Sequence, residues 1–244
     1  FAARTAYAES SPIGIAAGKP HEPARFVRAA NAVAELLHET AVWGDANTAT
    51  WIAPTPMRND HRLRLSVATS DPLSGSSGAA IFLTHHWQAT GNERSRTLAI
   101  AAMRNVAQHV DQSTHEGSRG GLGGAGGTIL ALWHAAAQLE DQHFAKTAQS
   151  SARRLARTVA NTLPYSASAS AQPPALCLRN GLSGTLLGAS ALHDHAIAKR
   201  VSECLIVSFR EAQESAAGVD ASSWIDTLFA LSCASAIIDV PELS

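Results

Sequence analysis

The sequence predicts an all-α fold, arranged as an incomplete ring of helical hairpins with a small β-hairpin near the N-terminus. Aromatic residues make up only 5% of the 244 residues while alanine is abundant, which favours helices packed closely through small side chains. Apolar residues recur at helical spacing along most of the chain. A glycine pair followed by an apolar helical stretch occurs three times, which indicates internal repeats.

The first expected element is an amphipathic helix over residues 22–40. Its apolar residues follow the helical period: Phe26, Val27, Ala30, Val33, Leu36 and Leu37. Between residues 48 and 69 the pattern changes to strand-like alternation around the turn signals Pro54, Pro56 and Asn59-Asp60. A β-hairpin insertion is expected there.

Three repeats follow, each with G-x-x-G before an apolar helix. The glycine pairs are Gly75 and Gly78, Gly124 and Gly127, and Gly181 and Gly184. Their first glycines are 49 and 57 residues apart, and each step has room for two helices with their loops. The second helices and the last helices are expected at residues 94–110, 142–163, 198–216 and 222–238, with loops at 112–119 and 165–174.

Paired glycines at a helix start allow close backbone approach. Without Cβ atoms the first helical turn can crowd its neighbours, and positive φ is available where the loop enters the helix. Openings from successive repeats can then converge at one end of the ring, so the six glycines are expected to line a cleft. The alternative is that they are only flexible loop residues, but the apolar pattern after each pair recurs as well.

Charge and cysteine content narrow the partners and the compartment. Nineteen Lys and Arg against twenty Asp and Glu, without long runs, give no support for nucleic-acid or membrane binding, so a small or peptidic partner is expected. Three cysteines without a CxxC pair indicate a reducing compartment. No membrane span or leader sequence is recognisable, and a cytoplasmic location is expected.

The two ends of the sequence suggest a piece of a longer polypeptide. The chain begins at Phe1 without Met and ends at Ser244 just after an apolar run. We expect residues 1–244 to form a single, truncated α/α domain with residues 48–69 as an insertion within it.

Residues 71–94 resemble the lanthionine synthetase C-like family, in which a G-x-x-G helix start precedes a T-G-D/N-x-R turn. Residues 120–132 and 178–189 resemble the next two repeats of that family. Residues 49–52 are similar to the entry into the cyclase domain of class II lanthipeptide synthetases. The resemblance covers about Asn31 to Leu205.

The resemblance implies an α/α toroid that binds a precursor peptide with dehydrated Ser and Thr. In the family, zinc activates a Cys thiol for addition to the dehydroamino acid, and an acid or base handles the enolate proton. The zinc ligands lie in W-C-x-G and C-H-G motifs of later repeats, and a catalytic His precedes a comparable glycine. The corresponding positions here are Leu73-Ser74, Leu122-Gly123 and Arg179-Asn180.

We therefore carry over no catalytic residue, no metal ligand and no cofactor-binding residue, and we expect no cofactor in this chain. The expected function is that of a cyclase-type domain forming thioether rings, incomplete or inactive alone. Its expected partners are the precursor peptide and either the remaining half of the cyclase or an upstream synthetase domain. The main alternative is a non-catalytic α/α scaffold that binds a peptide or protein. A further possibility is a carbohydrate-active α/α barrel, such as a glycosidase or epimerase, but it would need two cavity-facing carboxylates, and the inner-helix segments contain almost none.

Several cysteine and histidine residues near the repeats are candidates for metal ligands or catalytic groups. Cys177, beside the third glycine pair, is interpreted as a buried thiol, and Cys204 and Cys233 as core residues. His85, His86 and His134 have neither a partner at i+4 nor an HExxH context, so surface or hydrogen-bonded structural roles are favoured. His193 and His195 fall where a turn between helices is expected, so they are interpreted as exposed.

The remaining polar candidates have simple interpretations. The basic residues Arg153, Arg154, Arg157, Lys199 and Arg200 are expected on solvated outer faces. The serines near the glycines, Ser74, Ser76, Ser77 and Ser183, lack a G-x-S-x-G elbow, so a hydrolase triad is not expected.

Overall fold

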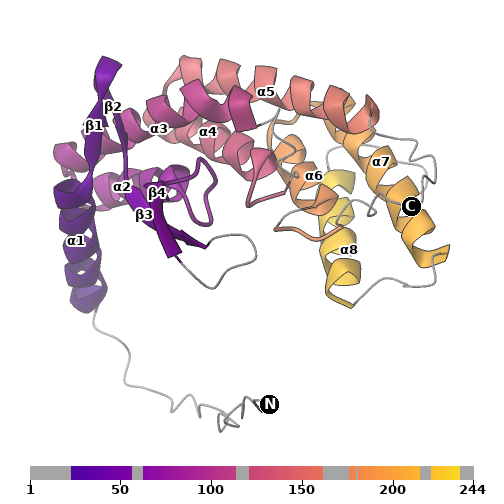
Figure 1. Ribbon diagram of the computed structural model, residues 1–244, viewed down its shortest axis with the longest axis horizontal. Helices are drawn as coiled ribbons and strands as arrows, with labels where there is room; N and C mark the ends of the chain where they lie inside the picture. The colour runs from indigo at the N-terminus through magenta and orange to yellow at the C-terminus, as the bar shows by residue number, and fades with distance from the viewer. Residues whose placement is uncertain are drawn as a thin grey trace, which may run out of the picture.

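A computed structural model describes residues 23–56, 63–113, 121–161, 176–179, 181–214 and 221–236. These residues are mostly helical, with four short strands near the N-terminus, which confirms the all-α fold with a small hairpin. The helices follow one another in an open arc, with α1 at one end and α8 at the other (Figure 1). In the part of the chain described, no helix is long and apolar enough to cross a bilayer.

Helix α1 spans Pro23–Thr40, as the helical period predicted. Ala34 is its buried residue and belongs to the hydrophobic core, and the helix packs on α2 and α3. Much of the predicted apolar face is nevertheless open to solvent, since Phe26 and Leu36 are 61% and 57% exposed. The helix therefore contacts the rest of the chain through a narrow strip.

Four strands form two separate antiparallel pairs. β1 (Val42–Gly44) pairs with β2 (Thr48–Thr50), and β3 (Ile52–Pro56) pairs with β4 (Leu63–Val67). The second pair is the expected hairpin; the first was not predicted, because its strands have only three residues each. Trp51, between the pairs, is buried and donates its indole N–H to Leu37 O at 3.0 Å, which ties the strands to α1.

Two of the expected turn residues lie within a strand. Pro54 and Pro56 belong to β3, opposite Leu65 and Leu63, whereas Asn59-Asp60 lies outside the described residues. Proline is tolerated in β3 because a two-stranded sheet consists only of edge strands, where a missing N–H can face solvent.

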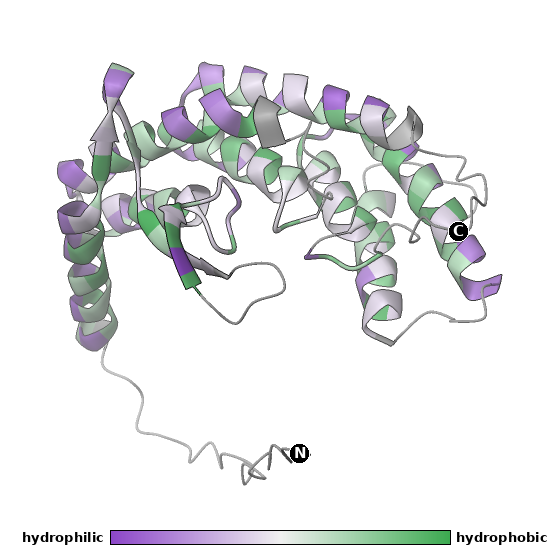
Figure 2. Cartoon of the chain, in the orientation of Figure 1, coloured by the Kyte–Doolittle hydropathy of each residue, from purple (hydrophilic) through white to green (hydrophobic). Residues whose placement is uncertain are grey.

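Among the residues described, seven further helices complete the arc. They are α2 (Ser76–Thr90), α3 (Glu93–Ser113), α4 (Ala125–Leu139), α5 (Gln142–Asn161), α6 (Leu182–Ala191), α7 (His195–Glu214) and α8 (Ala221–Ser235). The glycine-started helices α2, α4 and α6 pack on one another in sequence, and α8 packs on α6. The helices α3, α5 and α7 form an outer layer with more polar surfaces (Figures 1 and 2).

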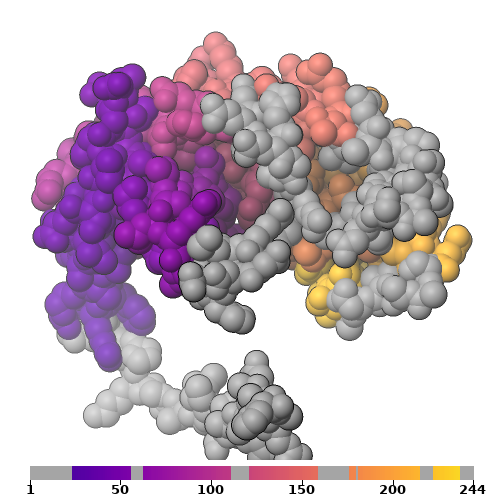
Figure 3. All heavy atoms as spheres, in the orientation of Figure 1, coloured from indigo at the N-terminus to yellow at the C-terminus, as the bar shows by residue number. Residues whose placement is uncertain are grey.

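The helical hairpins α2–α3, α4–α5 and α6–α7 each turn through one residue in the left-handed conformation. Gly91, Glu140 and His193 have φ angles of 71°, 55° and 51°. The inner helices before the first two turns have 15 residues each, whereas α6 has 10. In the space-filling view, the surface of α1 and its strands stands at one end of the arc and that of α7 and α8 at the other (Figure 3).

Candidate functional site: the glycine helix openings

Three inner helices begin at glycines. Gly75, Gly124 and Gly181 are the N-cap residues of α2, α4 and α6, and their φ angles are −127°, −149° and −126°. The expectation that these starts use positive φ is therefore wrong: Gly75 and Gly181 have extended backbone, and φ is negative at Gly124 as well. Gly121, three residues before the second start, does have a positive φ of 102°. We define the helix openings as the loops and first turns at residues 69–78, 121–128 and 176–185, with residue 180 not described.

The second glycine of each pair is required by close contact. A Cβ atom on Gly78, Gly127 or Gly184 would overlap a carbonyl oxygen of the loop just before its helix. At Gly184 the crowding extends to the neighbouring repeat, since the Cβ would lie 2.6 Å from Leu122 N and 2.7 Å from Gly121 Cα. Even an alanine would force the backbone to move, so sterics account for the glycines.

The second and third openings are joined backbone to backbone. Leu122 N donates to Leu178 O at 2.8 Å, and Gly123 N donates to Arg179 O at 2.6 Å. Buried loop backbone needs such partners, because an unpaired N–H away from water is costly. The missing Cβ atoms are what let the two loops approach to this distance.

Side-chain hydrogen bonds link these two openings to the first opening on one side and to α8 on the other. The single hydroxyl proton of Thr128 is shared between Ser70 O at 3.3 Å and Gly124 O at 3.0 Å, and Thr185 Oγ1 accepts from Gly121 N at 2.9 Å. On α8, the Asp226 carboxylate accepts from Leu178 N at 2.9 Å. Each inner helix after α2 thus bonds back to the opening before it, and the openings form one continuous rim. That this rim lines a ligand cleft stays a prediction.

Sequence reasoning missed these linking residues. Thr128 and Thr185 occupy the same place, directly after the second glycine, so a G-x-x-G-T pattern in two of the three repeats could have identified them. Asp226 has no comparable pattern, because α8 lacks the glycine pair.

The first opening is organised by a carboxylate. Asp71 is buried and accepts from the backbone N–H groups of Leu73 and Ser74, both at 2.9 Å, and from the Thr69 and Ser74 hydroxyls. Four donors satisfy the buried charge, which fixes the loop that leads into α2. This role of Asp71 was also not predicted.

The three cysteines are free thiols. Cys204 is buried as predicted, and burial raises the pKa of its thiol. Cys177 and Cys233 are only partly buried, so their interpretation as buried and core residues is wrong. Cys177 belongs to the third opening, and Cys233 lies near the end of α8.

His85 and His134 contact each other across α2 and α4. Their Nε2 atoms are 3.1 Å apart, and His85 Nδ1 is 3.1 Å from Gln88 Oε1. Since an amide oxygen only accepts, His85 carries its proton on Nδ1 and His134 donates from Nε2. Burial, and secondarily the His85 ring, lowers the pKa of His134. The hydrogen-bonded role predicted for these residues agrees with this geometry.

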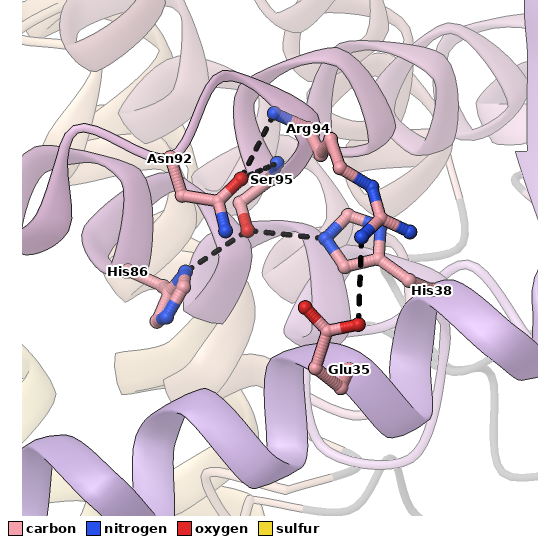
Figure 4. Close-up of polar contacts among 6 residues, drawn as sticks. All are labelled: Glu35, His38, His86, Asn92, Arg94 and Ser95. Carbon is pink, nitrogen blue, oxygen red and sulfur yellow. Dashed lines mark hydrogen bonds and ion pairs between the residues drawn. The ribbon is translucent and has the colours of Figure 1, made fainter.

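His86 belongs to a polar network between α1, α2 and α3 (Figure 4). Its Nδ1 lies 2.9 Å from Ser95 Oγ and its Nε2 lies 2.8 Å from Asn31 Oδ1, while His38 Nε2 lies 3.2 Å from the same hydroxyl. Asn31 Oδ1 accepts from His86, so His86 Nδ1 accepts from Ser95, and Ser95 accepts from His38. Every polar atom at the centre of this network is paired.

Of the other polar candidates, the histidines and basic residues lie outside the helix openings, whereas the serines belong to them. His193 and His195 are exposed at the α6–α7 turn, as predicted. The basic candidates are exposed on α5 and α7, except that Arg154 is partly buried. Of the serines, Ser74 is exposed, whereas Ser76, Ser77 and Ser183 are buried in the first helical turns, and Ser76 Oγ contacts Thr50 Oγ1 at 3.2 Å.

The described residues do not fit a catalytic zinc site. No group of three or more His, Cys, Asp or Glu side chains that could hold a metal ion occurs among them. At the helix openings, the side chains of Leu73, Leu122 and Arg179 offer no metal-binding atom. The Asp226 carboxylate, which contacts the third opening, accepts a hydrogen bond from the backbone of Leu178.

Residues 66–225 match the family model described as lanthionine synthetase C-like protein. The match spans well over half of the chain and includes all three helix openings, so the chain belongs to the lanthionine synthetase C-like family. No curated protein sequence matches the chain.

Proposed function

We propose that this chain is part of a cyclase-type module that forms thioether rings in a precursor peptide. In such a ring closure the Cys sulfur bonds to the Cβ of a dehydrated Ser or Thr, the S–H bond breaks, and a proton ends on the Cα. The step is an isomerisation and needs no oxidant. The observation that carries the proposal is the family match over the three joined openings.

The contribution we assign to this chain is peptide binding at the rim. Exposed Leu73 and Arg179 and partly buried Leu122 border the openings, and the crowded backbone beneath them gives a rigid floor. The zinc ligands would come from a partner segment, either the remaining half of the cyclase or another synthetase domain. The free cysteines support a reducing, cytoplasmic setting for this assembly.

A peptide-binding scaffold without a reaction of its own is the second candidate. The side chains at the openings favour this scaffold, because the described ones do not together form a complete set of metal ligands. The two candidates differ in what they require of the ligand. A cyclase module should prefer a peptide with dehydroalanine and Cys, whereas a scaffold has no need of either group.

The test uses a fluorescent peptide with one dehydroalanine and one Cys, and a control peptide with Ser and Ala instead. We expect the full chain to bind the first peptide more tightly in fluorescence anisotropy, and Leu73→Glu or Arg179→Glu to weaken this binding. The matched control Arg200→Glu, on the outer helix α7, should not weaken it. Equal affinity for both peptides would favour the scaffold, and absence of binding would refute the rim as a peptide site.

Ring closure is measured separately by thiol alkylation, because cyclisation leaves the peptide mass unchanged. We expect the chain alone, with added Zn²⁺, to leave the peptide thiol as reactive as in buffer. Protection of the thiol by the chain alone would show that a complete catalytic set is present and would contradict the proposed division between this chain and a partner segment.

A further inference from the structure

His85 and His134 occupy equivalent places in two repeats. Each stands ten residues after the first glycine of its repeat, on α2 and α4, so about 15 Å of helix separates it from that glycine. The packing of α2 on α4 brings the two rings together, with their centroids 5.1 Å apart. The corresponding residue of the third repeat is Ala191, the last residue of α6.

The separation of the two rings matches a shared metal ion. Their Nε2 atoms are 3.1 Å apart. An ion about 2.0–2.1 Å from each nitrogen, the usual distance for zinc and imidazole, would have an N–metal–N angle of about 98°. This value lies between the right angle of a square-planar or octahedral site and the tetrahedral angle. Both nitrogens can therefore bind one ion without a change in their separation.

The hydrogen bonds around the two histidines support metal binding by the pair. His85 Nδ1 donates to Gln88 Oε1, which leaves the lone pair on Nε2, the atom that faces His134. Gln88 in turn donates to Gln138 on α4, so a second hydrogen bond between the two helices fixes the first ring. Metal-binding histidines are usually oriented by such an acceptor on their other nitrogen. To bind the same ion, His134 would carry its proton on Nδ1 instead of Nε2, and both rings would turn so that their Nε2 lone pairs point at the ion.

We propose that His85 and His134 form a binding site for a divalent transition-metal ion, with water completing its coordination. Imidazole suits Zn²⁺, Ni²⁺ and Cu²⁺, and the order of affinities places Cu²⁺ highest. The site depends only on the packing of α2 against α4. It is therefore independent of whether the chain binds or cyclises a peptide.

The experiment titrates the purified chain with Zn²⁺ and Cu²⁺ against a chromophoric chelator. We expect one equivalent to bind more tightly than the background of the other histidines. His85→Ala and His134→Ala should each weaken that equivalent by at least about tenfold, because the chelate is lost. The matched control is His143→Ala, which removes an exposed histidine of α5 that has no histidine neighbour in the described contacts.

Two further measurements keep the outcome clear. Circular dichroism of each variant tests whether it is folded. If His134→Ala unfolds, His134→Gln is used instead, because it replaces the partly buried ring with a polar side chain. In the Cu²⁺ complex, electron paramagnetic resonance should show two equivalent nitrogen ligands, reduced to one in His85→Ala. Equal binding by the wild type and the His85→Ala variant, or a loss of the tight equivalent in His143→Ala as well, would overturn the proposal.

Discussion

The contact of α1 with the α2–α3 hairpin and the contact between the second and third helix openings hold distant segments together by opposite means. The first uses side chains, with the Ser95 hydroxyl shared between His86 and His38. The second contact depends on the absence of side chains, because glycines let the second opening donate two backbone hydrogen bonds to the third. The first contact should tolerate conservative changes that keep its hydrogen bonds. The second should tolerate no added atom.

The largest expected effect is at the glycine contact. Gly184→Ala places a Cβ against the Leu178 carbonyl oxygen and close to Leu122 N, so we expect a loss of about 3 kcal/mol or more in the free energy of unfolding. Gly91→Ala is the matched control: its Cβ meets no atom within 4 Å, and only the left-handed φ of 71° costs about 1 kcal/mol. Urea denaturation measures both, and equal losses would show that close contact is not the reason for Gly184.

The second largest loss of stability is expected in the polar network that joins α1 to α2 and α3. Ser95→Ala leaves His86 Nδ1 and His38 Nε2 without their shared partner, and we expect a loss of about 2 kcal/mol. Thr97→Ala, which removes an exposed hydroxyl bonded within α3, should cost less than about 0.5 kcal/mol. If Ser95→Ala proved as mild as Thr97→Ala, the network would not be what holds α1.

A smaller loss is expected where a side chain supports the glycine contact. Thr185→Val keeps the shape of the side chain but removes the acceptor of the buried Gly121 N–H, at a cost of about 1–2 kcal/mol. Thr147→Val, on the exposed face of α5, serves as the control. Chemical denaturation of the two variants would show whether the rim depends on this hydrogen bond in addition to close packing.

The smallest expected effect is the pH dependence of the α1 contact. Burial lowers the pKa of His38, with Arg94 and His86 lowering it further and Glu35 opposing them. The folded chain therefore binds the proton less readily than the unfolded chain, and stability should fall as pH drops below about 6.5, levelling off below the folded pKa. Denaturation of wild type and His38→Gln between pH 7.5 and pH 5 measures the difference; a steeper loss in His38→Gln would contradict this assignment.

The same comparison explains what the sequence could predict. The glycine pairs recur with apolar helices after them, so the hairpins and their helix starts were predictable from the repeat. Asn31, His86 and Ser95 come from three helices and follow no period, so nothing in the sequence indicates that they meet. The role of Asp71 could not be predicted either, because a single carboxylate before a glycine pair resembles any loop residue. Repetition reveals backbone geometry, whereas isolated polar contacts depend on the finished fold.

The left-handed residue at each hairpin turn offers a means of engineering this chain. The turn geometry recurs while the residue does not, since glycine holds the first position and Glu140 and His193 hold the others. A side chain in that conformation is strained by about 1 kcal/mol, so these two turns lower the free energy of unfolding below the value that the fold could reach. Glycine at either position would relieve this strain, at some cost from a more flexible unfolded chain, and would give a sturdier scaffold without altering the rim or the histidine pair.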